Sequence, residues 1–384
     1  MNAFPSQPDL LPARTTGHIA GVDIGGANIK WYVPGDPGAA TADTSRPAHP
    51  SAVARETSFA MWRHPQKLAD RLTEDWRAVG RGGVDSLAVT MTGELADCFA
   101  GRREGVHHII EQSMQAASRC GIRSVGFYST SGRLLTARQG RADVDGVAAA
   151  NWHALANAVA ERVAPDGVLI DIGSTTSDVV AIAGGQVLTT AKTDHQRLAD
   201  RSLVYLGCRR TPVCSLIDEA NWRGGTVPLM REVFATIDDA RLVSGRQVAV
   251  FDDCETADGR PRDLPSASRR LARMLGLGVD EWTSAELRDF AEQVVASAGR
   301  CLRIALDAAQ RRLDDRGVID PPTILSGHGQ DLLEAGGIDL GSRVIDLRDV
   351  LGREISRCAP AWAVVEVAES TRFFANLSTR PTGQ

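Results

Sequence analysis

The chain has 384 residues, of which 43% are hydrophobic and 24% charged, a composition typical of globular proteins and sufficient for two or three cores. A net charge of −5 gives no reason to expect nucleic acid or an anionic membrane as a partner, and no apolar run approaches the roughly 20 residues of a membrane helix. The seven cysteines are odd in number and widely spaced, which disfavours a disulfide framework or a zinc site and favours reduced thiols in a cytoplasmic protein.

The first chemical motif follows a short N-terminal lead. Residues 1–17 lack the basic and apolar regions of a secretory signal, and we expect them to be disordered. Residues 18–33 read HIAGVDIGGANIKWYV, an apolar run that ends in Asp23-Ile24-Gly25-Gly26 and is followed by a second apolar run. Runs rich in Val and Ile are typical of strands, and glycines permit a tight reversal between them. The motif predicts a β-hairpin with Asp23 at its mouth.

The next part of the chain alternates between predicted strands and helices. Residues 34–54 are rich in Pro, Gly and Ala and are expected to form a loop. Residues 65–79 place apolar side chains at four-residue steps, as in a helix, and residues 86–92 resemble a strand that ends at Gly93-Glu94. We then expect a helix over 104–120, a strand over 124–128 and an Ala-rich helix over 147–164. This alternation is the α/β pattern.

A second hairpin repeats the first. Residues 168–182 read VLIDIGSTTSDVVAI, in which Asp171-Ile172-Gly173 occupies the place of Asp23-Ile24-Gly25. Backbone N–H groups of such turns bind anions, and an adjacent Asp can hold a hydrated divalent cation. The two Asp residues lie about one domain length apart, which predicts two related lobes, 18–165 and 166–354, that face each other across a phosphate-binding cleft.

Other phosphate-binding motifs do not fit. The chain contains no G-x-x-x-x-G-K-[ST] sequence, which argues against a P-loop. Gly25-Gly26 leads into strand-like residues, whereas a dinucleotide fingerprint opens a helix. Hairpins with a purely structural role are the alternative, but the repetition of Asp-Ile-Gly favours phosphate binding.

The remaining residues complete the second lobe. Residues 192–264 are less regular, and we expect them to form an insertion that shapes the substrate site. Helices are predicted over 266–275 and 284–315, and a strand over 322–326 runs into Gly327-His328-Gly329. The C-terminal part, 355–384, contains a final helix, predicted over 361–375, that packs back on the body.

These elements together resemble the sugar kinase, actin and heat-shock ATPase superfamily. The resemblance rests on two hairpins with Asp-Ile-Gly and a late strand followed by Gly-x-Gly, in that order. It implies a two-lobed, actin-like (ribonuclease H-like) α/β fold with duplicated phosphate hairpins and a central cleft. In that superfamily the hairpins hold the phosphates, and the turn that corresponds to Gly327 and Gly329 borders the adenosine.

A narrower resemblance extends from about residue 18 to residue 375. The segments 89–106, 127–135, 148–156, 205–216 and 255–262 are similar to the hydantoinase/oxoprolinase-related proteins of tetrahydromethanopterin-linked one-carbon metabolism. This family implies a transferase of methanofuran-type cofactor biosynthesis. Such an enzyme joins an (aminomethyl)furanylmethyl diphosphate to the phenol oxygen of γ-glutamyl-tyramine, or of a tyrosine derivative, and releases pyrophosphate.

The resemblance assigns expected roles to the two hairpins. Asp23 and Asp171 would hold Mg²⁺ through waters, with Asp171 essential for catalysis. The phosphate oxygens would accept hydrogen bonds from the turn residues and from one of two side chains on the first hairpin, although Lys30 could equally face solvent. These donors are Gly25, Gly26, Gly173, Ser174, Thr175 and Thr176, with Asn28 or Lys30 as the additional side chain.

Glu94 is the candidate general base, because this superfamily often places its acid/base carboxylate at the corresponding strand end. Its alternative role is to cap the helix that follows. Two Arg pairs, Arg102/Arg103 and Arg209/Arg210, are candidates for binding pyrophosphate or glutamyl carboxylates, and the sequence does not choose between them.

Two other functions use the same hairpins. An ATP-dependent small-molecule kinase, or an oxoprolinase/hydantoinase-like hydrolase, would bind ATP there, so ATP is a second candidate ligand beside Mg²⁺. A regulatory, actin-like nucleotide-binding protein is the third possibility. The oligomeric state is left open.

Overall fold

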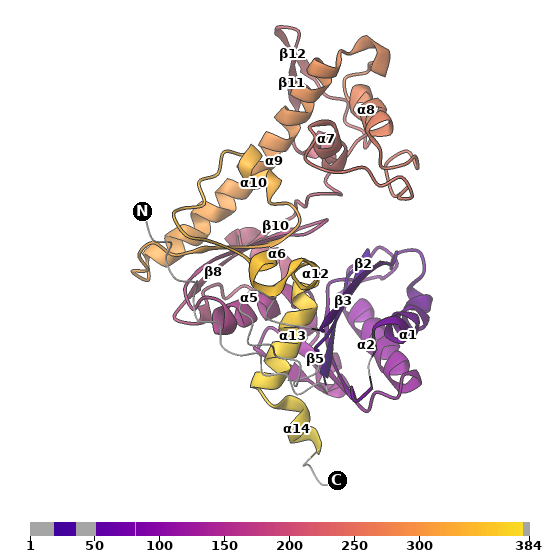
Figure 1. Cartoon of the computed structure of the whole chain (residues 1–384), viewed down its shortest axis with the longest axis vertical. Helices are drawn as coiled ribbons and strands as arrows, with labels where there is room; N and C mark the ends of the chain where they lie inside the picture. The colour runs from indigo at the N-terminus through magenta and orange to yellow at the C-terminus, as the bar shows by residue number, and fades with distance from the viewer. Residues whose placement is uncertain (1–18, 36–50, 81, 379–384) are drawn as a thin grey trace.

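The first lobe is built on a six-stranded sheet (Figure 1). The computed structural model describes residues 19–35, 51–80 and 82–378, so the predicted lead, 1–17, and most of the predicted loop, 34–54, lie outside the described residues. The strand order is β3-β2-β1-β4-β5-β6, in which β1 pairs antiparallel with β2 and parallel with β4. The strands are β1 Ile19–Ile24, β2 Asn28–Val33, β3 Val53–Ser58, β4 Ser86–Met91, β5 Ser124–Ser129 and β6 Arg133–Leu135.

The second lobe repeats this topology. Its strand order is β10-β8-β7-β13-β14, with β9 paired to β8, and its central strand β7 again pairs antiparallel with the next strand and parallel with a later one. The strands are β7 Gly167–Ile172, β8 Ser177–Ala183, β9 Gln186–Val187, β10 Leu203–Val204, β13 Thr323–Gly327 and β14 Val344–Asp346. Both predicted hairpins and the predicted two-lobed, actin-like α/β fold are confirmed.

Helices cover both faces of each sheet and form three cores. On the outer face of the first sheet lie α1 (Leu68–Val79) and α2 (Arg102–Arg119), and on that of the second lie α9 (Ser284–Asp314) and α10 (Asp331–Ala335). Between the two sheets, α5 (Asn151–Arg162) packs against α13 (Ala359–Ser370). This inner core contains Tyr32 of the first sheet and Leu169 of the second, so the lobes share one apolar interior.

The C-terminal helix α13 lies directly against β1. A Cβ atom on Gly21 would lie 2.0 Å from the carbonyl oxygen of Ala361, so only glycine permits this approach. The helix predicted over 361–375 is two helices, α13 and α14 (Phe373–Ser378), since Arg372 between them has a φ of +50°. Two short helices, α11 (Leu347–Leu351) and α12 (Arg353–Arg357), precede them.

The insertion is a separate small unit at the upper end of α9 in Figure 1. It contains the hairpin β11 (Glu219–Trp222) and β12 (Gly225–Pro228) with α7 (Ile237–Val243) and α8 (Leu264–Arg273). Its bounds differ from the predicted 192–264, because β10 pairs with β8 in the second sheet and α6 (Asp194–Asp200) contacts β10. The unit extends instead through α8 to the start of α9.

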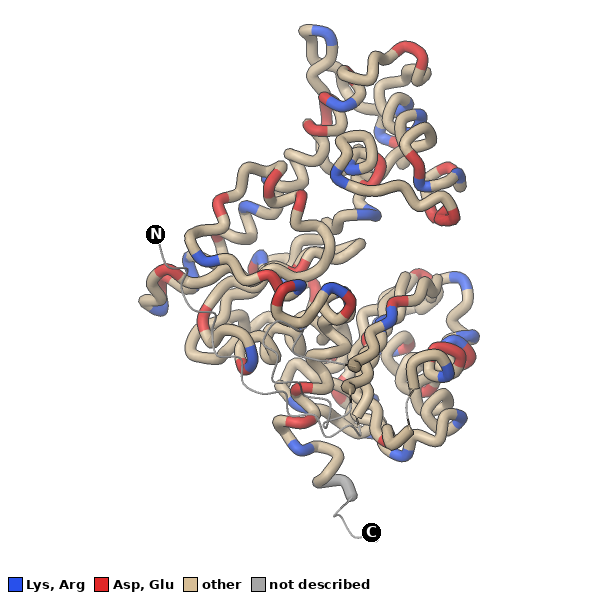
Figure 2. The backbone as a smooth tube through the Cα atoms, viewed as in Figure 1, with Lys and Arg blue, Asp and Glu red and all other residues tan. Residues whose placement is uncertain are grey.

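Buried ion pairs hold the insertion together. Arg262 binds both carboxylate oxygens of Asp238, and Arg270 lies 2.6 Å from Asp239, with all four side chains buried. Because a buried charge without its partner is strongly destabilising, these pairs specify one arrangement of α7 and α8. Figure 2 shows the corresponding basic and acidic positions close together in the insertion.

Three other elements differ from the sequence prediction. The helix expected over 147–164 is α4 (Val144–Val147) followed by α5, because Ala149 adopts a φ of +46° between them. The edge strand β3 falls partly in the predicted loop. A short helix, α3 (Ala137–Ala142), was not predicted. Within the described ranges, no helix is both long and apolar enough to cross a lipid bilayer.

Candidate active site

The turns of the two hairpins close in the same way. The Gly25 N–H donates to the carbonyl of Asn28, and the Gly173 N–H donates to the carbonyl of Thr176, each at 2.9 Å. Gly25 and Gly173 directly follow the central strands, so the turns occupy equivalent places in the two sheets. The repeated Asp-Ile-Gly sequence therefore encodes one repeated backbone geometry.

Neighbouring loops bind the carbonyl groups of both turns. In the first lobe, the carbonyls of Gly26 and Ala27 accept from the N–H groups of Met61 and Phe59, which follow β3. In the second lobe, the carbonyl of Ser174 accepts from the N–H groups of both Arg209 (3.1 Å) and Arg210 (3.0 Å). These bonds fix the orientation of the turn peptides.

The N–H groups of the turns remain available. Among the hydrogen bonds of the described residues, none has the N–H of Gly26, Ala27, Ser174 or Thr175 as its donor. Successive free N–H groups in a fixed turn form a concave anion site. The expected phosphate-binding residues thus lie in two turns of the required kind.

Strand register places polar side chains in a row across each sheet. In the first lobe, Asp23 lies opposite Thr90 on one side and Lys30 on the other, and Lys30 lies opposite Glu56. Residues directly opposite one another project from the same face of a sheet. Lys30 is half-buried beside carboxylates, so its side chain faces the cleft rather than open solvent.

The second lobe has a matching row. Asp171 lies opposite Ser326 on β13 and Asp178 on β8. Asp178 is buried and forms an ion pair of 2.6 Å with Arg197, whose guanidinium stacks over Trp152. Within the described residues, Asp171 is therefore the carboxylate of this row that forms no ion pair.

The two central carboxylates influence each other. Burial raises the pKa of Asp23 to about 6, with a further increase from the charge of Asp171 and an opposing effect of Lys30. Burial also raises the pKa of Asp171 to about 6, helped by Asp178 and opposed by Lys30. Burial acts to lower the pKa of Lys30, but Glu56, Asp23 and Asp171 together raise it. The three side chains form one electrostatic cluster between the lobes.

Buried oxygen atoms without partners surround this cluster. Within the described residues, Asp23 Oδ1 and Thr90 Oγ1 form no hydrogen bond, and the Ser326 hydroxyl faces the carboxylate of Asp171. Each such atom costs about 1–3 kcal/mol unless a ligand or water binds it. The described residues contain no group of three or more His, Cys, Asp and Glu side chains that could enclose a metal. A donor set of two carboxylates and hydroxyl groups fits Mg²⁺, which keeps several waters and binds substrate phosphates.

Glu94 lies beside the first turn. A Cβ atom on Gly93 would be 2.9 Å from the carbonyl oxygen of Gly25, and one on Gly105 would be 2.0 Å from that of Glu94. Because neither glycine has a side chain, the segment that contains the buried Glu94 packs closely between the first turn and α2. The capping alternative is wrong, since α2 begins after Gly101 without a side-chain cap and Glu104 binds the Ala100 N–H.

The environment of Glu94 suits proton transfer. Burial raises its pKa to about 7, with a further increase from Asp194 and an opposing effect of Arg102. Its Oε2 atom has no hydrogen-bond partner within the described ranges. A carboxylate that titrates near neutral pH can both accept and release a proton.

The Arg pairs occupy different places. Arg102, at the start of α2, forms an ion pair of 3.0 Å with Asp145, and Arg103 is exposed. Arg209 and Arg210 lie in the loop that holds the second turn, where Arg209 pairs with Asp253 at 2.5 Å. The structure thus brings the second Arg pair next to a phosphate turn.

The comparison with known families agrees with this arrangement. Residues 85–337 match the family model described as hydantoinase/oxoprolinase. The chain belongs to this family. The matched segment includes Glu94, the second hairpin, the insertion and Gly327-His328-Gly329.

Two proteins similar to this chain carry the same descriptive name, "(4-{4-[2-(gamma-L-glutamylamino)ethyl]phenoxymethyl}furan-2-yl)methanamine synthase". The protein of Methanocaldococcus jannaschii is 30% identical over 352 residues, which cover 91% of this chain and 97% of the relative. The protein of Methanococcus vannielii is 24% identical over 210 residues, 54% of this chain and 92% of the relative.

Solved structures with a similar arrangement are more distant. A ROK family glucokinase from Streptomyces griseus in complex with glucose and AMPPNP is 14% identical, with a TM-score of 0.43 over 92% of this chain and 100% of the other. An activator of 2-hydroxyisocaproyl-CoA dehydratase from Clostridium difficile, with bound ADPNP, is 13% identical, with a TM-score of 0.39 over 93% and 97%.

The Gly-x-Gly turn closes the second lobe beside Asp171. Gly327 has a φ of +80°, and its Cβ would lie 2.2 Å from the carbonyl oxygen of Ile172. The next residue, His328, donates its N–H to that same carbonyl at 3.0 Å. A Cβ on Gly329 would lie 2.2 Å from the Ile172 side chain. These glycines are therefore required by packing, whether or not adenosine binds next to them.

Sequence reasoning missed several cleft residues. Glu56, Thr90 and Ser326 lie opposite or next to the expected ligands only through strand register. His328 is half-buried near Lys30 and Glu56, and loss of solvation lowers its pKa to about 4. The signal for Thr90 and Ser326 was present, because both stand near the end of a predicted strand.

Proposed function

We propose that this protein joins an (aminomethyl)furanylmethyl diphosphate to the phenol oxygen of a glutamyl-tyramine or tyrosine acceptor, with release of pyrophosphate. The observation that carries the proposal is the pairing of Asp23 and Asp171 between two turns with free N–H groups. The descriptive name of the two relatives specifies a product with the same phenoxymethyl-furan linkage.

The turns and Lys30 would stabilise the departing pyrophosphate. The bond between the furanylmethyl carbon and the diphosphate oxygen breaks, and its electron pair leaves with the pyrophosphate. The electron-rich furan stabilises the cation that remains. Fixed N–H donors of Gly26, Ala27, Ser174 and Thr175 would bind the growing negative charge. Mg²⁺, held by Asp23 and Asp171 through waters, would supply further charge neutralisation when bound.

Glu94 would accept the proton of the phenol. The phenol oxygen forms the new bond to the furanylmethyl carbon, and its proton passes to the carboxylate. A carboxylate with a pKa near 7 is a stronger base than an ordinary Glu, which suits a phenol whose reference pKa is near 10. We also propose a cytoplasmic location, which the seven free cysteines support.

The decisive experiment offers the purified protein both reactions. With Mg²⁺, a furanylmethyl diphosphate and γ-glutamyl-tyramine, we expect pyrophosphate release that depends on both substrates. With Mg²⁺ and ATP in place of the diphosphate, we expect no ADP or phosphate above the level of the D171N variant. Release of ADP without pyrophosphate would assign the site to a kinase or an ATP-dependent hydrolase.

A further inference from the structure

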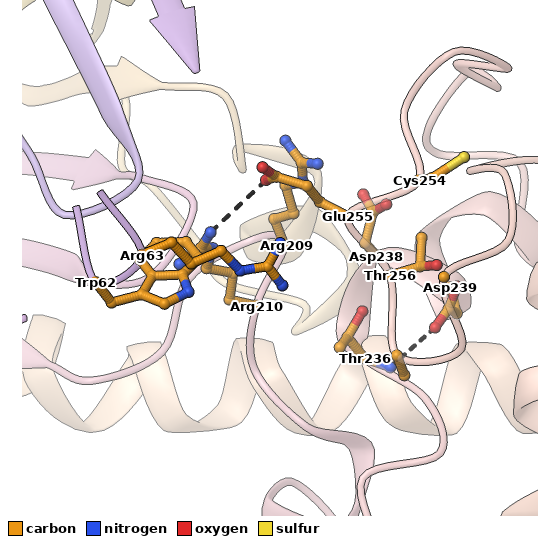
Figure 3. A pocket seen from close by; sticks show the side chains of 12 residues that line it. Trp62, Arg63, Arg209, Arg210, Thr236, Asp238, Asp239, Cys254, Glu255 and Thr256 are labelled. Atoms are coloured by element: carbon orange, nitrogen blue, oxygen red, sulfur yellow. Dashed lines mark hydrogen bonds and ion pairs between the residues drawn. The ribbon is translucent and has the colours of Figure 1, made fainter. Parts of the chain in front are cut away.

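A pocket of about 620 Å³ lies where the first lobe, the second lobe and the insertion meet (Figure 3). The loop after β3 contributes Trp62 and Arg63, the loop after β10 contributes Arg209 and Arg210, and the insertion contributes the opposite wall. This volume lies within the range of small-molecule sites, about 300–1,000 Å³. The pocket is thus a candidate for the part of a substrate that extends beyond the reacting atoms.

The pocket is directly connected to both phosphate turns. Trp62 follows Met61, whose N–H donates to the carbonyl of Gly26 at 2.9 Å. Arg210 donates its N–H to the carbonyl of Ser174 at 3.0 Å. One wall of the pocket is therefore fixed to each turn, and a molecule in the pocket adjoins a diphosphate bound between the turns.

The wall nearest the turns presents an aromatic ring and two guanidinium groups whose hydrogen-bond donors are not all used. The guanidinium of Arg210 stacks over the Trp62 ring at 4.7 Å and lies 3.8 Å from Glu255, too far for a hydrogen bond. The side chain of Arg63 is exposed and forms neither an ion pair nor a hydrogen bond with the described residues. Two planar guanidinium groups with free donors are suited to bind a carboxylate.

The opposite wall is acidic, and one of its carboxylates is available. Asp238 and Asp239 are already bound by Arg262 and Arg270 of the insertion. Glu255 is exposed, with only a long contact of 3.4 Å to the Ser58 hydroxyl besides that to Arg210. An ammonium group is the complementary partner for such a carboxylate, whereas a diphosphate would be repelled by this wall.

We infer that this pocket binds the amino-acid end of the phenolic acceptor. Its carboxylate would be bound by Arg63 and Arg210, and its ammonium group by Glu255. This inference rests on the proposed function, since a γ-glutamyl group carries one carboxylate and one ammonium on the same carbon. Trp62 directly follows Met61 at the first turn and stacks with Arg210, so its ring would contact the linker of the acceptor. The insertion thus selects the acceptor, and the hairpins bind the donor.

The test compares two acceptors that share the phenol. γ-Glutamyl-tyramine carries the carboxylate and ammonium, and N-acetyltyramine lacks both. For R63Q and E255Q we expect the KM of γ-glutamyl-tyramine to rise about 10- to 100-fold, the effect of losing one charge-assisted contact, with kcat nearly unchanged. The KM of N-acetyltyramine should not change. R133Q, an exposed change on the distal strand β6, is the matched control.

Equal effects of R63Q on both acceptors, or no effect on either, would overturn the inference. Direct binding of γ-glutamyl-tyramine by calorimetry separates this outcome from failure of the proposed reaction. If the wild type releases no pyrophosphate but binds γ-glutamyl-tyramine more tightly than R63Q does, the reaction is wrong and the pocket assignment stands. If R63Q and R133Q bind it equally, the pocket assignment is wrong.

Discussion

The two lobes share one topology but differ in charge at the position next to the central Asp. In the first lobe, Asp23 lies opposite Lys30, which faces the cleft. In the second lobe, Asp171 lies opposite Asp178, whose charge is neutralised from behind by Arg197. The two similar lobes are thus asymmetric, because a cation lies opposite the central Asp in the first lobe only.

The same asymmetry extends to proton transfer. Glu94 follows β4 in the first lobe, whereas the equivalent strand of the second lobe, β13, ends at Gly327 and is followed by His328-Gly329. The packing of these glycines against Ile172 leaves no carboxylate at that place. In the proposed mechanism, the repeated turns therefore supply two anion sites, whereas the base lies in one lobe only.

The largest expected effect comes from Glu94. E94Q should reduce turnover about 10²- to 10⁴-fold, because the amide keeps the size of the side chain but cannot accept a proton. A more acidic, fluorinated phenol acceptor should recover part of the lost rate. Wild-type turnover should rise with pH through about 7, as Glu94 becomes deprotonated, and E94Q should lose this dependence. A full rate in E94Q would show that the base lies elsewhere.

Asp171 distinguishes a ligand-binding carboxylate from a structural one. D171N should reduce turnover about 10²-fold or more, because it removes a charge that faces the diphosphate site. At pH 8, above its raised pKa of about 6, Asp171 is charged in a site that disfavours the charge. The neutral amide of the variant removes this cost, so at pH 8 the variant should unfold at a higher temperature than the wild type. A melting curve and a rate titration with Mg²⁺ measure both effects. Wild-type activity at every Mg²⁺ concentration would make Asp171 structural.

D178N tests the opposite case in the same row. The change leaves the buried Arg197 without its partner, which should lower the free energy of unfolding by about 3–5 kcal/mol. Thermal or urea unfolding of D178N and D171N side by side measures the contrast. If both variants gain stability, the structural distinction between these two carboxylates fails.

The smallest expected effect is a pH dependence of stability without ligand. The pKa values of Asp23 and Asp171 are raised from 3.8 to about 6 in the folded state, so the folded protein binds more protons than the unfolded chain between these values. Their contribution is full below pH about 4 and is lost as the pH rises through 6, in total about 3 kcal/mol per group, of which about 1 kcal/mol falls between pH 5 and pH 8. Urea unfolding at pH 5 and pH 8 should show the loss, and D23N should reduce it. Equal stability of wild type and D23N at both pH values would contradict these pKa shifts.

Local patterns predicted the hairpins because Asp-Ile-Gly fixes a strand end and a turn within a few residues. The edge strand β3 was not predicted, because its sequence, VARETS, lacks the apolar runs of the buried strands. The interruption of the predicted helix at Ala149 was not predicted either, because a run of Ala favours a helix and only the surrounding structure imposes the positive φ.

Most of the site chemistry is non-local. The proximity of Lys30 to Glu56 depends on the pairing of β2 with β3, and the pocket joins segments from both lobes and the insertion. No spacing in the sequence encodes those contacts. The insertion bounds were misplaced because β10 is only two residues long and carries no periodic signal.

The position of α13 has a consequence for synthesis of the chain. The strands of the first lobe are complete once residue 135 has left the ribosome, but the helix that covers their inner face spans Ala359–Ser370. Throughout the intervening elongation, the apolar inner face of that sheet lacks its native cover, and transiently exposed surface of this kind promotes aggregation and chaperone binding. The hairpin β1–β2 of the first lobe therefore acquires its final support only when the last helices of the chain emerge.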